Sequence, residues 1–426
     1  MSGADAEPPR QTRRAPAVPP GIAAEMAAAG GTVTFARFMD LALTHPTEGY
    51  YSRAARLLGP RGHFSTAPRL SAAFNLAVCR LLEELVDELA GATAGPVALV
   101  ELGAGEADLA KAVLRDWDGR RNDLRDAIDY SIVEVPGRLR VRQRRALAGA
   151  VQKGWRIGWT DGLPEAFGDG AGAGSAQAAR AIAAFGNEFI DALPVHRVDV
   201  RGDEALETWV ELIEGVSGYA LRETLRPLSQ AAEEELALLF GSTGAAQLRR
   251  LTSDGSIELR PAVGALLGEL AATQLPVCLL TVDYGEWFAE AQEPPAGRQT
   301  QTAVPAGSSS APERAPLRRR TIRGYFRHQT VADPYVRVGS QDLTADVDFF
   351  ALDRHGRRYG FETVLFTSVA ALLTANGAEK RLDALRAKVA AGRGTLGADR
   401  EATVLAALLD EAGVGGAFKV MLQARE

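Results

Sequence analysis

One segment constrains the fold of this chain more than any other: an apolar run that leads directly into two closely spaced glycines. Residues 97–101 (VALVE) have the composition of a buried strand, Gly103 and Gly105 follow, and residues 108–117 have the apolar spacing of a helix. Glycine is favoured at such a turn because any Cβ would block a ligand that lies against the backbone. An ordinary tight turn is the alternative. Strand, glycine turn and helix together favour a nucleotide-type binding loop.

The alternation of strand and helix extends on both sides of this loop. We expect further strands at 130–135, 155–159, 180–185 and 275–283, and helices at 71–89 and 138–148. This βαβ pattern is typical of parallel sheets with right-handed crossovers. The predicted fold class is therefore α/β, a Rossmann-like mixed sheet with helices on both faces.

Composition and patterning divide the chain into seven parts. We predict a disordered tail (1–30), an N-terminal helical cap (31–95), a Rossmann-like core (96–196), an inserted α+β lobe (197–270), another core strand (271–292), a flexible Pro/Ser/Gly/Gln-rich linker (293–320) and a C-terminal part of the core with substrate-side elements (321–426). The lobe should contain a helix at 230–239. The C-terminal part should contain strands at 321–326, 349–353 and 418–423 and helices at 364–373 and 378–408.

The overall charge disfavours several classes of partner. With 48 Lys+Arg against 54 Asp+Glu, the net charge of −6 provides no basic field for nucleic acid. No apolar stretch approaches the roughly 18 residues needed for membrane insertion. Cys79 and Cys278 are the only cysteines and lie in apolar runs, which indicates buried thiols and a cytoplasmic location. The five histidines have no zinc-site spacing, so no metal is expected.

The charge of the glycine turn favours a cationic ligand. A dinucleotide-binding loop would have a third glycine where this chain has Asp108. Asp108, together with Glu101 at the strand end, would repel a pyrophosphate but suit the sulfonium and amino groups of S-adenosylmethionine. Glu134 ends the next strand, about 30 residues past the glycines, where a carboxylate can bind ribose hydroxyls. Asp161 after the third strand is a candidate for the adenine amino group.

A second acidic strand end follows the fourth strand. Residues 185–194 (FGNEFIDALP) contain Asn187, Glu188 and Asp191 among apolar side chains. A guanidinium could pair bidentately with Glu188, and Asp191 could assist by accepting the proton released when an arginine nitrogen is alkylated. The competing interpretation is that Asn187 and Asp191 cap a helix while Glu188 faces solvent.

A third strand end, at 281–285, places Tyr284 near the predicted acceptor pocket, to which His328 could also contribute. His328 is otherwise a structural histidine. Three nearby acids, Asp342, Asp346 and Asp348, lack the glycine and terminal glutamate of a calcium loop, and we reject a metal site there.

Several segments of the chain resemble the MidA family of methyltransferases. The segments that carry the resemblance are GYYS, GHFSTAPRLS, VELGAGEADLA, YSIVEV, NEFIDALPVHRV, TVDYG, GYFRHQTVADP, QDLTADVDF and FKVML. The resemblance implies a class I methyltransferase sheet, S-adenosylmethionine bound at Glu101, Gly103, Gly105 and Glu134, and Ser65 and Thr66 in a loop over the site. The family's mitochondrial member symmetrically dimethylates an arginine of a complex I subunit. The implied partner is therefore a protein acceptor with an arginine, a respiratory complex subunit among the candidates, with a homodimer as a candidate assembly.

The chain departs from the family pattern in the loop expected over the site. His63 and Arg69 replace acids, Ala104 replaces a proline, and residues 338–341 lack a usual proline-glycine pair. These changes weaken the inference of arginine specificity more than that of the cofactor. Three other functions are considered: a small-molecule methyltransferase on the same fold, a non-catalytic assembly scaffold and, most distantly, a nicotinamide oxidoreductase.

Overall fold

The computed structural model describes residues 18–53, 67–135, 137–163, 179–201, 204–215, 218–241, 254–288, 321–327, 329–392 and 395–426. The predicted linker at 293–320 lies outside these residues, as does most of the predicted tail. Within that tail, however, Pro20–Ala28 form helix α1, with Ile22, Ala23 and Met26 fully buried. The expectation of disorder as far as residue 30 is therefore wrong for this stretch.

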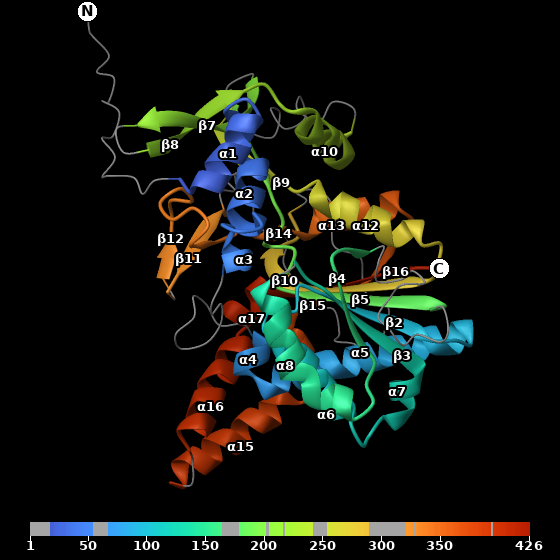
Figure 1. Ribbon diagram of the computed structural model, residues 1–426. Coiled ribbons are helices and arrows are strands. Elements are labelled where there is room, and N and C mark those ends of the chain that lie inside the picture. The colour runs from blue at the N-terminus through green and yellow to red at the C-terminus, as the bar shows by residue number, and fades with distance from the viewer. Residues whose placement is uncertain are drawn as a thin grey trace, which may run out of the picture.

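A mixed sheet of eight described strands forms the centre of the molecule (Figure 1). Its order is β15-β16-β10-β5-β2-β3-β4, and β14 pairs with the end of β10. The strands β2, β3, β4, β5 and β10 are parallel, whereas β16 runs antiparallel to both of its neighbours. The bounds are β2 Val97–Leu102, β3 Ile128–Val133, β4 Ile157–Thr160, β5 Ala181–Asn187, β10 Val277–Glu286, β14 Val347–Asp348, β15 Glu362–Ser368 and β16 Phe418–Arg425.

The order of the strands reverses beside β2. From β2 the chain passes to β3 and β4 on one side, and it then returns to place β5 and β10 on the other side. β2 and β5 are neighbours in the sheet. After the carboxyl end of β2 the chain continues toward β3, whereas after the carboxyl end of β5 it continues toward β10, on the opposite side. Open α/β sheets usually bind their ligands at such a switch point.

Helices cover both faces of this sheet, which explains why its strands are apolar without alternation. On one face lie α5 (Ala72–Thr93), α6 (Asp108–Trp117) and α14 (Val369–Ala375), and on the other lie α12 (Ala262–Ala272) and α13 (Phe349–Arg358). Leu99 belongs to the first core and Val100 to the second. The connections from β2 to β3 and from β3 to β4 contain α7 (Asn122–Ala127) and α8 (Arg138–Gln152).

The inserted lobe is a second, antiparallel sheet in the order β1-β7-β6-β9, with β8 also paired to β7. Its elements are β1 (Thr32–Thr34), β6 (His196–Arg201), β7 (Glu204–Gly215), β8 (Gly218–Arg226), α10 (Gln230–Phe240) and β9 (Asp254–Leu259). The helix α10 begins at the predicted residue. Because β1 pairs with β7, the N-terminal segment is not a purely helical cap but supplies a strand to the lobe.

Several short elements lie outside these two larger sheets. They comprise α2 (Phe35–Thr44), α3 (Tyr50–Arg53), α4 (Ala67–Leu70) and a small sheet of β11 (Arg323–Phe326), β12 (Gln329–Val331) and β13 (Asp342–Thr344). A hydrophobic core formed by α1, α2 and β1 reaches Val210 of β7 and Leu343 of β13. The N-terminal elements, the lobe and the small sheet therefore share one core.

The C-terminal region differs most from the sequence prediction. The strand expected at 349–353 is the first turn of α13, because Asp348 accepts hydrogen bonds from the backbone N–H groups of Phe350 and Ala351. The first half of the helix expected at 364–373 is instead part of strand β15, and α14 begins only after Ser368 caps it. The helix expected at 378–408 is two helices, α15 (Ala378–Ala390) and α16 (Leu396–Leu408), which form the hairpin at the lower left of Figure 1; α17 (Val414–Ala417) precedes β16.

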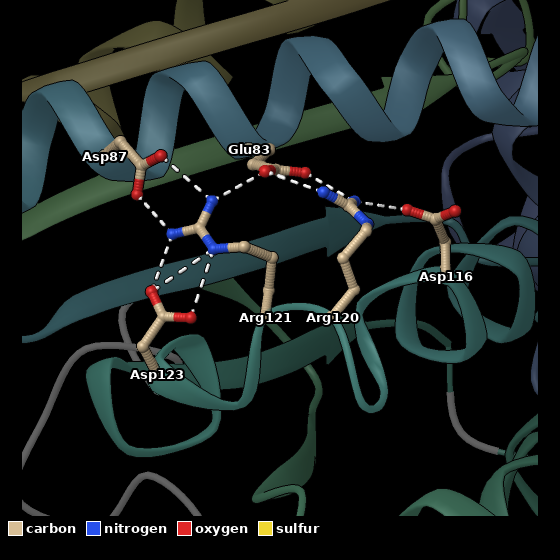
Figure 2. A network of polar contacts seen from close by, with 6 residues as sticks. All are labelled: Glu83, Asp87, Asp116, Arg120, Arg121 and Asp123. Carbon is tan, nitrogen blue, oxygen red and sulfur yellow. Dashed lines mark hydrogen bonds and ion pairs between the residues drawn. The ribbon is translucent and has the colours of Figure 1, made fainter.

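An ion-pair network fixes the turn between α6 and α7 to α5 (Figure 2). The Arg121 guanidinium contacts Glu83, Asp87 and Asp123, each at 2.7 Å, and Arg120 bridges Glu83 and Asp116. Since α6 begins at the carboxyl edge of the sheet and α7 returns to the start of β3, this network lies at the opposite edge from the glycine turn. No helix among the described residues is long and apolar enough to cross a bilayer.

Candidate functional site

Strand register brings the predicted residues to one edge of the sheet. Leu102 pairs with Val133 and with Gly186, and Val133 pairs with Thr160. The next residues along these strands are Gly103, Glu134, Asn187 and Asp161. Val282 pairs with Asn187, so Asp283 lies level with Glu188. The sequence predicted each of these positions as a strand end, and the sheet places them side by side.

The glycine turn has the backbone shape that the motif predicts. Gly103 has φ +63° and Gly105 has φ +55°, both in the left-handed region. A Cβ on Gly103 would lie 2.7 Å from Cδ2 of Phe189, so the turn and the segment after β5 are already in contact. The Gly103 N–H donates to the Val133 carbonyl at 2.9 Å. A narrow cradle of backbone at this position fits a ligand that lies flat against the turn.

Glu134 is held in place by a residue that the sequence did not single out. The Gln143 side chain is fully buried in α8, and its Nε2 donates to Glu134 Oε2 and to the Gly105 carbonyl, both at 2.9 Å. Its Oε1 accepts from Trp159 Nε1 at 2.9 Å. Burial raises the pKa of Glu134 to about 7 against the effect of the Gln143 hydrogen bond. Gln143 therefore links the glycine turn, the ribose candidate and β4.

Glu101 is almost fully buried beneath the turn, at 3% exposure. Its carboxylate accepts from the Tyr130 hydroxyl at 2.8 Å. Burial raises the pKa of Glu101 to about 8. A buried acid with a single hydrogen-bond partner among the described residues is suited to a cationic ligand group.

Asp108, at the start of α6, pairs with cations of the chain. Its Oδ1 pairs with Lys111 at 2.5 Å, and its Oδ2 lies 3.6 Å from Arg69. Two cations of the chain therefore neutralise this acid, one of them from the loop in which the chain departs from its family. An attraction between Asp108 and a cationic ligand stays a prediction. Of the two acids, Glu101 is the one without an ion-pair partner among the described residues.

Asp161 lies at the predicted strand end but pairs with Arg140, and its side chain is 59% exposed. Arg140 also donates to the carbonyls of Glu134 and Thr160. A contact between Asp161 and an adenine amino group stays a prediction. Ser65, Thr66 and His328 lie outside the described residues.

The predicted acceptor residues follow β5, beginning with Glu188. Residues 188–195 form a turn rather than a helix, so the interpretation of Asn187 and Asp191 as helix caps is wrong. Glu188 is half-buried and has φ +51°, a strained backbone conformation for a residue with a Cβ. Its Oε1 accepts from Asn187 Nδ2 at 3.2 Å. The Asn187 Oδ1 is buried and has no hydrogen-bond partner among the described residues.

Further carboxylates lie close to Glu188. Asp191 Oδ2 accepts from the Thr344 hydroxyl at 2.6 Å, and Asp342 Oδ1 accepts from the Tyr51 hydroxyl at 3.0 Å. Burial, and then the charge of Asp191, raise the pKa of Glu188 to about 8 and that of Asp342 also to about 8. Glu188 and Asp191 follow β5, whereas Asp342 begins β13, so these acids converge only in the fold.

Tyr284 borders the same region. Its ring stacks on Phe418 with centroids 4.3 Å apart, and burial followed by the charge of Glu188 raises the pKa of its hydroxyl. The other two acids of the triple motif have separate partners: Asp346 pairs with Arg323 at 2.7 Å, and Asp348 caps α13.

The comparison with protein families decides the class. The model of the family Methyltransf_28, described as an S-adenosyl-L-methionine-dependent methyltransferase, matches residues 78–367. The chain belongs to this family. The glycine turn, Glu134, Glu188 and Asp283 all fall within the range that the Methyltransf_28 model matches.

Named relatives of this Methyltransf_28 member are arginine methyltransferases. The protein arginine methyltransferase NDUFAF7 of Mus musculus, a mitochondrial protein, is 26% identical over 349 residues, which cover 76% of this chain. The Drosophila melanogaster homolog is also 26% identical, over 347 residues. The match spans 66% of the length of each of these relatives.

Solved structures agree with this assignment. A protein from Burkholderia thailandensis, solved with bound S-adenosyl-homocysteine, is 28% identical to this chain with a TM-score of 0.69. The match covers 95% of this chain and 90% of the Burkholderia thailandensis chain. A native structure from the same organism is 27% identical with a TM-score of 0.67. The chain is an S-adenosylmethionine-dependent methyltransferase on an α/β sheet of the predicted class, and the cofactor prediction is confirmed.

Proposed function

We propose that this Methyltransf_28 member methylates a guanidinium nitrogen of a protein arginine. The observation that carries the proposal is the cluster of acids Glu188, Asp191 and Asp342, in which the charge of Asp191 adds to burial in raising the pKa of both other carboxyls. Burying several carboxylates close together costs free energy, and a cationic substrate would offset this cost. The arginine methyltransferase relatives point to the same acceptor.

The polar atoms of the pocket suit arginine better than lysine. A guanidinium is planar and presents parallel N–H donors, so it can pair bidentately with Glu188. The Asn187 Oδ1, which has no hydrogen-bond partner in the described part of the chain, offers one further acceptor beside that carboxylate. A lysine ammonium, which is a compact point charge, would gain nothing from this planar arrangement.

We propose that the cofactor lies across the glycine turn and that Glu101 and Glu134 are its polar contacts. Gln143 orients Glu134 through its hydrogen bond. S-adenosylmethionine supplies an electrophilic methyl group when bound. The residues of the chain orient the acceptor: Glu188 fixes the plane of the guanidinium, so that one nitrogen faces the glycine turn. Asp191, hydrogen-bonded by Thr344, accepts the proton that this nitrogen loses when it becomes methylated.

Product analysis tests this function. The full chain is incubated with methyl-labelled S-adenosylmethionine and a peptide mixture in which one position is arginine, lysine or citrulline, and the modified residue is identified by mass spectrometry. We expect label on arginine alone, with Glu188→Gln inactive and the exposed-site control Glu379→Gln as active as the wild type. Label on lysine, or on arginine to the same extent with Glu188→Gln, would overturn the proposal.

A further inference from the structure

The turn that carries Glu188 is held by a buried carboxylate at the end of the neighbouring strand. Asp283 in β10 has no exposed surface. Its Oδ2 accepts hydrogen bonds from three successive backbone N–H groups, those of Phe189 at 3.2 Å, Ile190 at 2.9 Å and Asp191 at 3.1 Å. Its Oδ1 accepts from the Tyr284 N–H at 2.9 Å. All four contacts are donated to Asp283, which is the pattern of an ionised carboxylate.

A buried guanidinium holds the other end of the same turn. Arg260 lies between β9 and α12 and is 7% exposed. Its Nε donates to the Leu193 carbonyl at 3.2 Å, and its Nη2 donates to the Ala345 carbonyl at 2.8 Å. Its Nη1 reaches the Asp346 carbonyl at 3.3 Å. Arg260 therefore joins the turn after β5 to the segment after β13. Thr344, which donates a hydrogen bond to Asp191, is the last residue of β13.

The two buried charges act through the backbone between them. Asp283 accepts hydrogen bonds from the N–H groups at the start of the turn. Arg260 donates to the Leu193 carbonyl at the end of the turn and to the Ala345 carbonyl in the neighbouring segment. Each charge also stabilises the other electrostatically, although burial raises the pKa of Asp283 well above its ordinary range. Buried charges persist when hydrogen bonds and an opposite charge compensate their desolvation.

We infer that Asp283 and Arg260 are positioning residues for acceptor methylation, which fix the 188–193 turn so that Glu188 stays in its left-handed conformation. The inference rests on the proposed role of Glu188. A strained backbone conformation persists only where surrounding contacts over-determine it. Here Glu188 also donates its N–H to the Val282 carbonyl at 2.9 Å, immediately before Asp283. Preorganising an orienting carboxylate in this way raises the rate of transfer without contributing to cofactor binding.

Hydrogen exchange and kinetics on the full chain test this inference. In Asp283→Asn the charge is lost at nearly constant volume, and the new NH₂ group replaces one of the two acceptors. We expect amide exchange in residues 188–193 to accelerate about tenfold and kcat for the arginine peptide to fall about tenfold, whereas KM for S-adenosylmethionine changes less than about threefold. Asp353→Asn, at a 3% exposed aspartate of α13, is the matched control and should leave the turn unchanged.

Two outcomes would overturn the inference. One is unchanged exchange at 188–193 in Asp283→Asn, and the other is acceleration of equal size in β2 and β3, which would make Asp283 a general stability residue. Should this variant fail to fold, Arg260→Lys keeps the charge, removes the forked donors and is expected to loosen residues 193 and 345. Hydrogen exchange needs no methyl acceptor, so it tests this inference separately from the proposed function. If the wild type did not methylate arginine but Asp283→Asn still accelerated exchange at 188–193, the proposed function would be rejected while the role of Asp283 in fixing the turn would stand.

Discussion

At the scale of single residues, both turns to which we assign ligand contacts contain residues with left-handed backbone. Gly103 and Gly105 have positive φ where a ligand must approach, and Glu188 has positive φ despite its side chain. Phe189 fills the space that a Cβ on Gly103 would need, so the cofactor turn and the acceptor turn pack directly on each other. A bulkier residue at Gly103 would therefore also press on the turn that carries Glu188.

Glu188→Gln should abolish methyl transfer while S-adenosylmethionine affinity stays within a few-fold of the wild type. The amide keeps the shape of the side chain but loses the charge that orients the guanidinium. Single-turnover assays with calorimetric cofactor titration make the comparison. An equal loss of both quantities would remove the assigned role of Glu188.

Gly103→Val should prevent cofactor binding. The substitution places a Cβ 2.7 Å from the Phe189 ring at a backbone φ of +63°, which a β-branched residue rarely adopts. Calorimetric titration with S-adenosyl-homocysteine checks this, with circular dichroism to establish that the variant is folded. Unchanged affinity in a folded variant would mean that the turn does not contact the cofactor.

The rate of transfer should increase with pH through about 8. The pKa of Glu188 is raised to about 8, so below that value most of the free enzyme carries a neutral acid that pairs weakly with a guanidinium. At saturating S-adenosylmethionine, kcat/KM for the arginine peptide should rise about tenfold per pH unit on the acidic side and level off above 8. A profile that is flat between pH 6 and 9 would contradict the assignment.

At the scale of elements, the ion pairs in Figure 2 should contribute to stability but not to cofactor binding. Arg121 is 17% exposed and faces three carboxylates that join α5 to the α6–α7 turn. Arg121→Ala should lower the free energy of unfolding by about 1–2 kcal/mol, since charged hydrogen bonds in a network are lost. Cofactor affinity should not change, because the network lies at the other edge of the sheet. Denaturant unfolding, with the exposed Arg386→Ala as control, measures the effect, and equal losses in both variants would contradict it.

Local patterns predicted the elements that build the cofactor side. The strand at 97–101, the helix at 108–117 and the glycine turn between them follow from residues that are neighbours in the chain, and α6 has the predicted bounds. The prediction failed at 349–353, where two phenylalanines and a leucine resemble a strand. The N-cap contacts of Asp348 to Phe350 and Ala351 favour a helix there instead.

The candidate site was predictable only in part. Residues that end parallel strands could be found from the sequence because every such end meets the same edge of the sheet. Gln143, Arg260 and Thr344 could not, since each becomes important through a partner that is distant in the chain, such as Gly105, Leu193 or Asp191. The pairing of Asp108 with Arg69 was missed for the same reason.

At the scale of the whole molecule, the sheet divides the two proposed substrates between the two sides of its switch point. β2, β3 and β4 present the glycine turn, Glu134 and Asp161, whereas β5, β10 and β13 present the acids that we propose bind the acceptor. The lobe and the small sheet lie beside this second group. A respiratory complex subunit as acceptor, a homodimer and a cytoplasmic location stay predictions from the sequence.

The most direct test of this account is calorimetric titration of the S-adenosyl-homocysteine complex with three peptides that differ only in an arginine, a lysine or a citrulline. Citrulline has the shape of arginine without its charge, so it isolates the interaction with Glu188. The account predicts binding of the arginine peptide alone, and loss of that binding in Glu188→Gln. Equal affinity for arginine and citrulline, or arginine binding that survives Glu188→Gln, would contradict a guanidinium pocket at this edge of the sheet.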